Sequence, residues 1–217
     1  ATTPNVVLSL GLGLTLLVAI AQIQANLSAQ IHGALPEDAP AFFFIDVQPD
    51  QIDAFDTALN GVDGVYEVVR APMLRAAITK IAGVPVAEAE VSPEARWAVR
   101  GDRGLTYAAH KPAGSQIIEG DWWPGNYMGP AKVSLDVDLA RGMGLGIGDT
   151  LSFNVMGREI QAEIANLRRI NWSTMGLNFA VIFATGTLER APHSYLASVR
   201  LHPDAEAKVD LLVADDF

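Results

Sequence analysis

The chain has 217 residues, of which 50% are hydrophobic and 18% are charged, and its formal net charge is −10. A nucleic-acid partner is therefore not expected, because binding to the phosphate backbone needs an excess of clustered positive charge. Cysteine is absent, which excludes disulfides, thiolate zinc sites, iron–sulfur clusters and a cysteine nucleophile.

The first segment is strongly apolar: residues 6–21 read VVLSLGLGLTLLVAIA, and every charged residue comes after residue 36. A helix over residues 6–25 would span about 30 Å, the thickness of the hydrocarbon core of a bilayer. We therefore expect residues 1–35 to form a transmembrane helix and a stalk. A cleaved signal peptide and a buried core helix are the alternatives, but the first lacks basic N-terminal residues and the second does not explain the missing polar face.

Two further features concern the ends of the chain and its orientation. The chain begins with Ala1, has its first methionine at Met73 and ends on VADDF without a turn or cap, so we expect it to be a piece of a longer protein. Residues 26–69 contain no Lys or Arg but carry eight Asp and Glu residues. Because Lys and Arg are retained on the cytoplasmic side of a membrane helix, the globular part is expected to face away from the cytoplasm.

A strand–helix–strand unit is predicted next. Pro36 and Pro40 bracket a linker, and FFFIDV at residues 42–47 is an apolar run of strand length. Asp50 can then cap a helix, and the side chains on its apolar face are Ile52, Phe55 and Leu59. Strand-like spacing resumes over residues 65–81, so residues 36–91 form the first predicted segment of the globular part.

The middle of the chain, residues 92–194, is predicted to be rich in strands. Ser92-Pro93-Glu94 is typical of a helix start, and Asp136, with Ser134, can open another short helix. Residues 150–167 have the alternation of a β-hairpin with its turn near Gly157-Arg158, and NFAVIFA at residues 178–184 predicts a further strand.

The last segment, residues 195–217, begins with a predicted strand over residues 195–201. A helix then starts at Pro203, and its apolar residues are Val209, Leu212 and Val213. The fold class is α+β. This second strand and helix, at the end of the chain, are expected to pair with the strand–helix–strand unit predicted at its beginning.

Catalytic, metal and cofactor sites are not predicted. The histidines are far apart in sequence and have no ligand at i+3 or i+4, so we expect exposed loop residues at His32, His110, His193 and His202. The glycine-rich run at residues 142–149 follows a helix and precedes a strand, which is the reverse of the dinucleotide-binding order, and it predicts a turn. Arg168-Arg169 is interpreted as a solvated strand end.

Two glycine-rich loops carry aromatic and methionine residues. If these residues are exposed, they are the candidate contacts for an apolar ligand or an interface. The candidates are Trp122, Trp123, Tyr127, Met128, Trp172 and Met175. The alternative is that the tryptophans are core anchors beneath a loop. Sequence does not show whether the two loops lie together.

A series of strings in one order resembles the extracytoplasmic domain of MacB/FtsX-type ABC transporter permeases, in particular the large permeases called YbbP-like. The strings are LSLGLGLTLLVAIAQIQANL from residue 8, APAFFFIDVQPDQ from residue 39, APMLRAAITKIAGVPV from residue 71, RGLTYAAHKP from residue 103, IIEGDWWPG from residue 117, VSLDVDLARGMGLGIGDTLSFNVMGREIQAEIANLRRINW from residue 133 and NFAVIFATGTLERAP from residue 178. Together they cover nearly the whole chain.

The resemblance implies a discontinuous porter-like part, residues 36–91 and 195–217, with an inserted β-rich part at residues 92–194. It also implies a bacterial inner-membrane protein with its globular part on the periplasmic side, a separate ATPase subunit that binds ATP, and transport or extraction of hydrophobic or lipid-linked molecules. No catalytic residue carries over, and no enzymatic activity is expected. A membrane-anchored binding or assembly module and a serine hydrolase are the alternatives.

Overall fold

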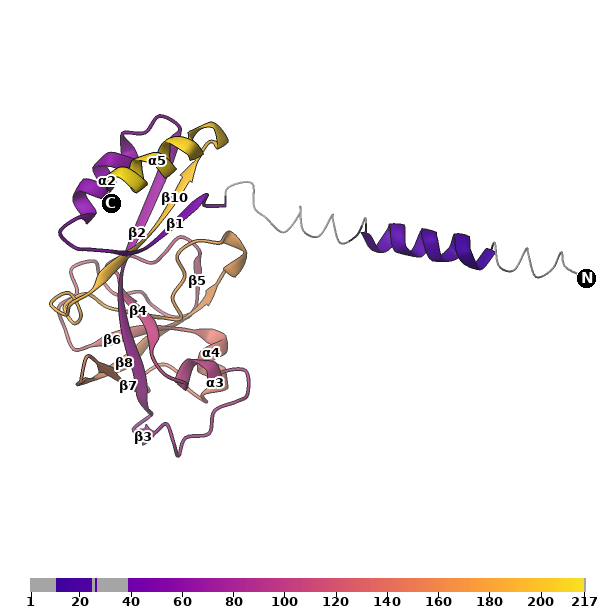
Figure 1. Cartoon of the computed structure of the whole chain (residues 1–217). Helices are drawn as coiled ribbons and strands as arrows, with labels where there is room; N and C mark the ends of the chain where they lie inside the picture. Colours follow the sequence, from indigo (N-terminus) through magenta and orange to yellow (C-terminus); the bar gives the residue numbers. More distant parts are fainter. Residues whose placement is uncertain (1–10, 25, 27–38, 217) are drawn as a thin grey trace, which may run out of the picture. The chain divides into compact units, whose positions relative to one another are not determined.

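The computed structural model describes residues 11–24, 26 and 39–216, and the chain divides into two compact units, residues 1–39 and 40–217 (Figure 1). Residues 11–24 are helical, and their large apolar side chains are exposed. Within the described part of the chain, no helix has the length and hydropathy needed to cross a membrane.

The predicted transmembrane helix over residues 6–25 is therefore not supported by the described residues. Residues 6–10 and 25 lie outside the described residues, and so do the predicted stalk, Pro36 and His32.

The predicted strand–helix–strand unit is confirmed. Strand β1 (Phe42–Val47) is followed by helix α2 (Ile52–Asn60) and strand β2 (Val65–Ile81). The predicted cap is wrong: Gln51, not Asp50, precedes the helix, and no side chain accepts a hydrogen bond from its first turn. The backbone N–H of Gln51 bonds instead to Gln48 O, so a turn leads into the helix.

The C-terminal strand and helix join this first unit. Strand β10 (Ser194–Leu201) lies between β1 and β2 and is antiparallel to both. A 3₁₀ turn (Pro203–Ala205) then leads into helix α5 (Glu206–Asp216). Helices α2 and α5 cover one face of the three strands (Figure 1), and the core between them includes Phe55, Leu59, Val199 and Val209. We call this the αβ part.

The remaining elements form a β-rich part around a larger core. Its elements are β3 (Val84–Pro85), α3 (Arg96–Val99), β4 (Arg103–Tyr107), β5 (Ser115–Gly120), β6 (Lys132–Asp136), α4 (Val137–Gly142), β7 (Thr150–Val155), β8 (Arg158–Ile170) and β9 (Val181–Phe183). The predicted hairpin is confirmed as β7 and β8, with the turn at Met156-Gly157. The result is a mixed α and β structure with a large sheet.

Three sequence predictions differ in detail from the structure. Asp136 caps α4 through its side chain, as predicted, but Ser134 lies within β6. The helix signal at Ser92 gives a turn, and the helix itself, α3, begins only at Arg96. The strand predicted over residues 178–184 contracts to β9, because the preceding residues enter a loop.

Strand β2 belongs to both parts. Residues 65–73 pair with β10, and residues 74–81 pair with β3, β4 and β7. In Figure 1 this strand runs from the αβ part through the molecule to β3. A third core lies against its middle, with Trp123, Phe179 and Ile182 packed against Ala71 and Met73. The two parts therefore share one continuous strand and an apolar contact, which we call the junction.

Candidate functional site

The loop after β5 places two tryptophans in the third core. Trp123 is 6% exposed and donates its ring N–H to Ala108 O at 2.8 Å, while the ring N–H of Trp122 bonds to Ala109 O at 3.0 Å. The ring centroids of this pair are 4.2 Å apart. A buried indole needs an acceptor for its N–H, and both indoles have one. Trp123 therefore has little surface to offer a ligand.

Tyr127 and Met128 continue the same loop; Tyr127 packs against the third core, and Met128 lies at the surface. The Tyr127 hydroxyl donates to Pro130 O at 2.8 Å, and the Tyr127 carbonyl accepts from Thr185 Oγ1 at 2.8 Å. Met128 is 80% exposed. It lies beside Gly186, where an added Cβ would meet Met128 Sδ at 3.4 Å. The structure thus holds the backbone of Tyr127 in place and leaves Met128 at the surface.

The second predicted loop is exposed. Trp172 begins a 3₁₀ turn whose preceding residue, Asn171, accepts a hydrogen bond from Ser173 N at 3.1 Å. Trp172 is 59% exposed and Met175 is 43% exposed. Met175 has φ +49°, a left-handed conformation that costs a residue with a Cβ roughly 1–2 kcal/mol. This loop is shaped by its own local bonds.

A groove of about 320 Å³ lies where the αβ part meets the loops of the β-rich part. One wall comes from β2 and β10, through Val69 and Ser198. The other wall comes from residues 112–114, 174 and 176–178. Thr174 and Gly176 flank Met175 in sequence, so the exposed second loop borders this groove. We call it the junction groove.

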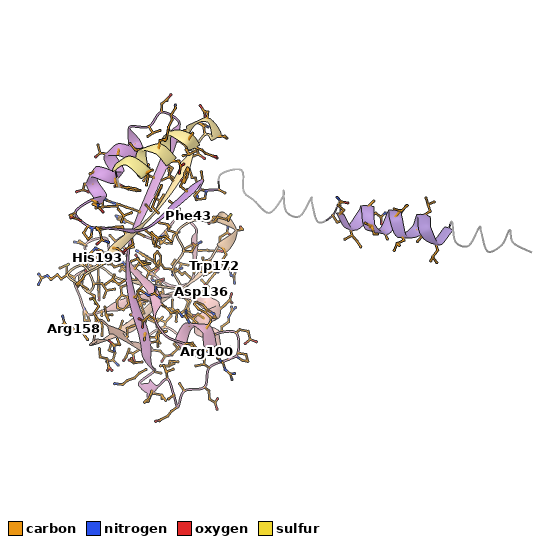
Figure 2. All side chains as sticks on the ribbon, viewed as in Figure 1. Phe43, Arg100, Asp136, Arg158, Trp172 and His193 are labelled. Carbon is orange, nitrogen blue, oxygen red and sulfur yellow. The ribbon has the colours of Figure 1, made fainter. Side chains whose placement is uncertain are left out.

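The wall on the αβ part is the sheet face that the helices leave open. In register across the strands lie Phe43, Ser198 and Val69, in that order. Phe43 and Ile45 are exposed on β1, and Phe43 lies on the same side of the view as Trp172 (Figure 2). An exposed apolar surface beside a groove is typical of a binding site for an apolar ligand or partner.

An ion pair lies at one end of the groove. Glu67 on β2 and Arg200 on β10 are register partners, and the Arg200 guanidinium donates to a Glu67 carboxylate oxygen. The Arg200 side chain is largely buried while that of Glu67 is half exposed. A paired charge adds polarity to the groove without leaving an unpaired ion against an apolar ligand.

The residue that sequence reasoning missed is Arg168. The interpretation of Arg168-Arg169 as a solvated strand end is wrong for the first arginine, which is only 1% exposed, and it holds for Arg169, which is exposed. The alternation along β8 contained the signal, since the nearest neighbours of Arg168 on the same face are both buried: Asn166 and Ile170. A strand turns every second side chain to the same face.

Arg168 ties together two segments that line the groove. Its guanidinium donates to Phe179 O and, at 3.5 Å, to Ser115 Oγ. Residues 112–114 lead into Ser115, and residues 176–178 lead into Phe179. Burial lowers the pKa of Arg168 to about 10, and the Asp136 carboxylate opposes that shift. The guanidinium remains charged at neutral pH, and it positions one wall of the groove.

The histidines differ partly from the prediction. His110 and His202 are exposed as expected, but His193 is half-buried, with Nε2 3.4 Å from the hydroxyls of Tyr107 and Tyr195. Burial and the neighbouring Tyr195 and Glu189 raise the pKa of Tyr107 to about 12. Among residues 11–24, 26 and 39–216, no group of three His, Asp or Glu residues could hold a metal ion.

The structure therefore separates the six predicted contact residues into three places. Trp122 and Trp123 lie in the third core, and Tyr127 follows them. Met128 lies beside Gly186, and Trp172 and Met175 belong to the loop whose Thr174 and Gly176 line the junction groove. Whether any of these residues contacts a ligand stays a prediction.

Comparison with known proteins gives one informative similarity. No family model matches the chain. The chain is 28% identical over 189 residues, or 87% of its length, to a protein of Escherichia coli (strain K12) named as an uncharacterized ABC transporter permease, YbbP. The chain spans only 22% of that relative's length.

A solved structure was also compared. It is a domain of a protein from Porphyromonas gingivalis assigned as a permease, with 13% sequence identity and a TM-score of 0.39. The match covers 83% of this chain and 76% of that one.

Proposed function

We propose that the chain is part of a permease subunit of an ABC transporter, in which the unit of residues 40–217 is an outer domain without enzymatic activity. The similarity to the Escherichia coli permease over 87% of the chain carries this proposal. Within it we also propose the MacB/FtsX-type subtype, a bacterial inner-membrane location with this unit on the periplasmic side, and a separate ATPase subunit.

The junction groove supports a coupling role for this domain. It is bounded by both parts of the unit, so a rigid-body movement of one part against the other would change its width. The sheet face beside it exposes the apolar side chains Phe43 and Val69, with Ser198 between them in one register row. We propose that ATP-driven movement opens and closes the groove around a hydrophobic or lipid-linked substrate.

The test uses thiol cross-linking, because this chain contains no cysteine, and any cysteine elsewhere in the full-length protein is first replaced by serine. In the full-length protein that contains this segment, Val69→Cys and Gly176→Cys place thiols on opposite walls of the junction groove, where a short bis-maleimide can bridge them. The protein is reconstituted with its ATPase, and ATP turnover is measured before and after cross-linking. We expect cross-linking to abolish the part of ATP turnover that depends on the permease.

The matched control is Phe43→Cys with Val69→Cys. Both residues lie on the same open sheet face. Phe43 on β1 and Val69 on β2 each pair with Ser198 on the strand between them, so they are roughly 9–10 Å apart. A bridge between them joins two points of one part and should leave ATP turnover unchanged. Complete cross-linking across the groove with unchanged turnover would refute the coupling role, and failure of the ATPase to associate with the protein would refute the permease assignment.

A further inference from the structure

A second cavity, of about 480 Å³, lies in the β-rich part and has no residue in common with the junction groove. It is formed by the β7–β8 turn, by residues 129–131 and by residues 186–192. Its apolar walls include Ala131, Val155, Ile160 and Pro192, and two cationic side chains, Arg158 and Arg190, line it as well. We call it the arginine pocket, and its lining residue Arg158 is labelled in Figure 2.

The two guanidinium groups are available to a ligand. Within the described residues, neither Arg158 nor Arg190 has a hydrogen bond or an ion pair with another side chain. Glu159 also lines the pocket, but its carboxylate is 2.7 Å from Lys80 Nζ and is therefore already paired. In a chain with a net charge of −10, this pocket concentrates unpaired positive charge.

In the described part of the chain, the next acidic neighbour forms no ion pair with either arginine. Glu189 precedes Arg190 in sequence, but its carboxylate accepts the backbone N–H of Gly186 and so caps the turn that forms one wall. Two planar guanidinium groups, each able to form paired hydrogen bonds, match the oxygens of a carboxylate or a phosphate. The polar half of the pocket is thus suited to a compact oxyanion.

One methionine lines the pocket and a second lies beside its lining residue Gly186, and a solvated turn requires neither of them. Met156 is 67% exposed and has φ +50° at the first position of the β7–β8 turn, where Asn, Asp or Gly is normally preferred. Met128 lies against Gly186 on the other side. Flexible, polarizable methionine side chains are suited to contact with apolar chains of variable shape.

We propose that the arginine pocket binds an anionic amphiphile, with its carboxylate or phosphate between Arg158 and Arg190 and its apolar chain against Val155, Ile160 and the two methionines. A site with apolar walls and a few convergent charges fixes the head group of a ligand and buries its body. The proposal concerns a site separate from the junction groove and does not depend on the function proposed for that groove.

Binding of three decyl probes to the full chain tests the proposal. Decyl phosphate, decanoate and neutral decyl maltoside are titrated below their micelle concentrations, together with inorganic phosphate, by isothermal titration calorimetry. We expect one or both anionic probes to bind at least tenfold more tightly than decyl maltoside and than inorganic phosphate. The ratio between decyl phosphate and decanoate then identifies the preferred head group.

Substitutions localise the binding. Arg158→Gln and Arg190→Gln should each weaken binding of the preferred anionic probe about tenfold, and the double variant should abolish it. Arg169→Gln removes an exposed arginine outside the pocket and should bind like the wild type. All three positions are exposed, so unchanged thermal melting is expected, and Arg158→Lys serves as a second variant that keeps the charge.

Three results would overturn the proposal. The first is that neither anionic probe binds. The second is that inorganic phosphate or decyl maltoside binds as tightly as the anionic probes, because the head group and chain would then not act together. The third is that the double arginine variant binds the probe as well as the wild type does.

Discussion

The two predicted loops have similar composition and opposite environments. Trp123 is buried because Ala108 O, distant in sequence, accepts its ring N–H and Phe179 packs in the same core. Trp172 is exposed, and the hydrogen bonds that shape its loop come from Asn171, one residue away. The contrast shows that amphipathic composition marks a loop as unusual, while distant partners decide whether its aromatic residue becomes core or surface.

The largest expected effect tests this contrast directly. Trp123→Ala should lower the free energy of unfolding by about 3–5 kcal/mol, because it opens a cavity in the third core and leaves Ala108 O without its donor. Trp172→Ala should change it by less than about 0.5 kcal/mol, since the side chain is mostly in water. Urea denaturation followed by far-ultraviolet circular dichroism measures both.

The contrast fails if the two substitutions cost the same. An equal large cost would place Trp172 in a buried site, and an equal small cost would remove the third core as a source of stability. Trp97→Ala is a suitable control, because Trp97 is also about half exposed.

The next test compares the neighbouring arginines Arg168, which is buried, and Arg169, which is exposed. Arg168→Met should lower the free energy of unfolding by about 1–3 kcal/mol, since Phe179 O and Ser115 Oγ lose their buried donor. Methionine is long and unbranched like arginine, so the effect of lost volume is kept small. Arg169→Met should cost less than about 0.5 kcal/mol because that side chain is exposed. Chemical denaturation of the two variants gives the difference.

Arg168 also has an expected local effect. If it positions the groove wall, Arg168→Met should raise hydrogen exchange at residues 112–114 and 176–178 more than in the β7–β8 hairpin. A uniform rise over the whole unit would indicate a general loss of stability and would contradict the positioning role.

Local periodicity predicted most of the fold. The mostly apolar run at residues 42–47, the helical spacing of Ile52, Phe55 and Leu59, and the alternation through the β7–β8 hairpin each favour one structure, and each is found. What failed locally was the predicted cap of α2. Asp50 has the right chemistry for a cap, but the turn at Gln48 takes its place.

The candidate site was less predictable, because it depends on contacts between distant segments. The sequence marks Trp172 and Met175, but the opposite wall, Val69 and Ser198, is created by the pairing of β2 with β10, which are more than a hundred residues apart. Arg168 was misread because a charge is usually solvated. Its partner Phe179 O has no sequence signal at all.

A binding measurement sharpens the comparison between the loops. If Trp172 contacts a hydrophobic ligand at the junction groove, Trp172→Ala should weaken binding of a fluorescent lipid about tenfold, which corresponds to about 1.4 kcal/mol. Trp97→Ala, which removes another exposed tryptophan outside the groove, should leave the affinity unchanged. Equal affinities for the wild type and both variants would remove Trp172 from the ligand site.

The smallest expected effect concerns the backbone of the exposed loop. At most sites Gly is less stabilising than Ala, because it loses more conformational entropy on folding. Met175 has φ +49°, where a Cβ is unfavourable by roughly 1–2 kcal/mol, so the order should reverse: Met175→Gly should be more stable than Met175→Ala by up to about 1 kcal/mol. Both variants lose the same side chain, so their difference isolates the backbone.

Met128, which is exposed and does not have a positive φ, should show the usual order, with Met128→Ala the more stable. If urea denaturation gives the usual order at Met175 as well, the loop is not fixed in its left-handed conformation, and local bonds alone do not hold Trp172 at the groove.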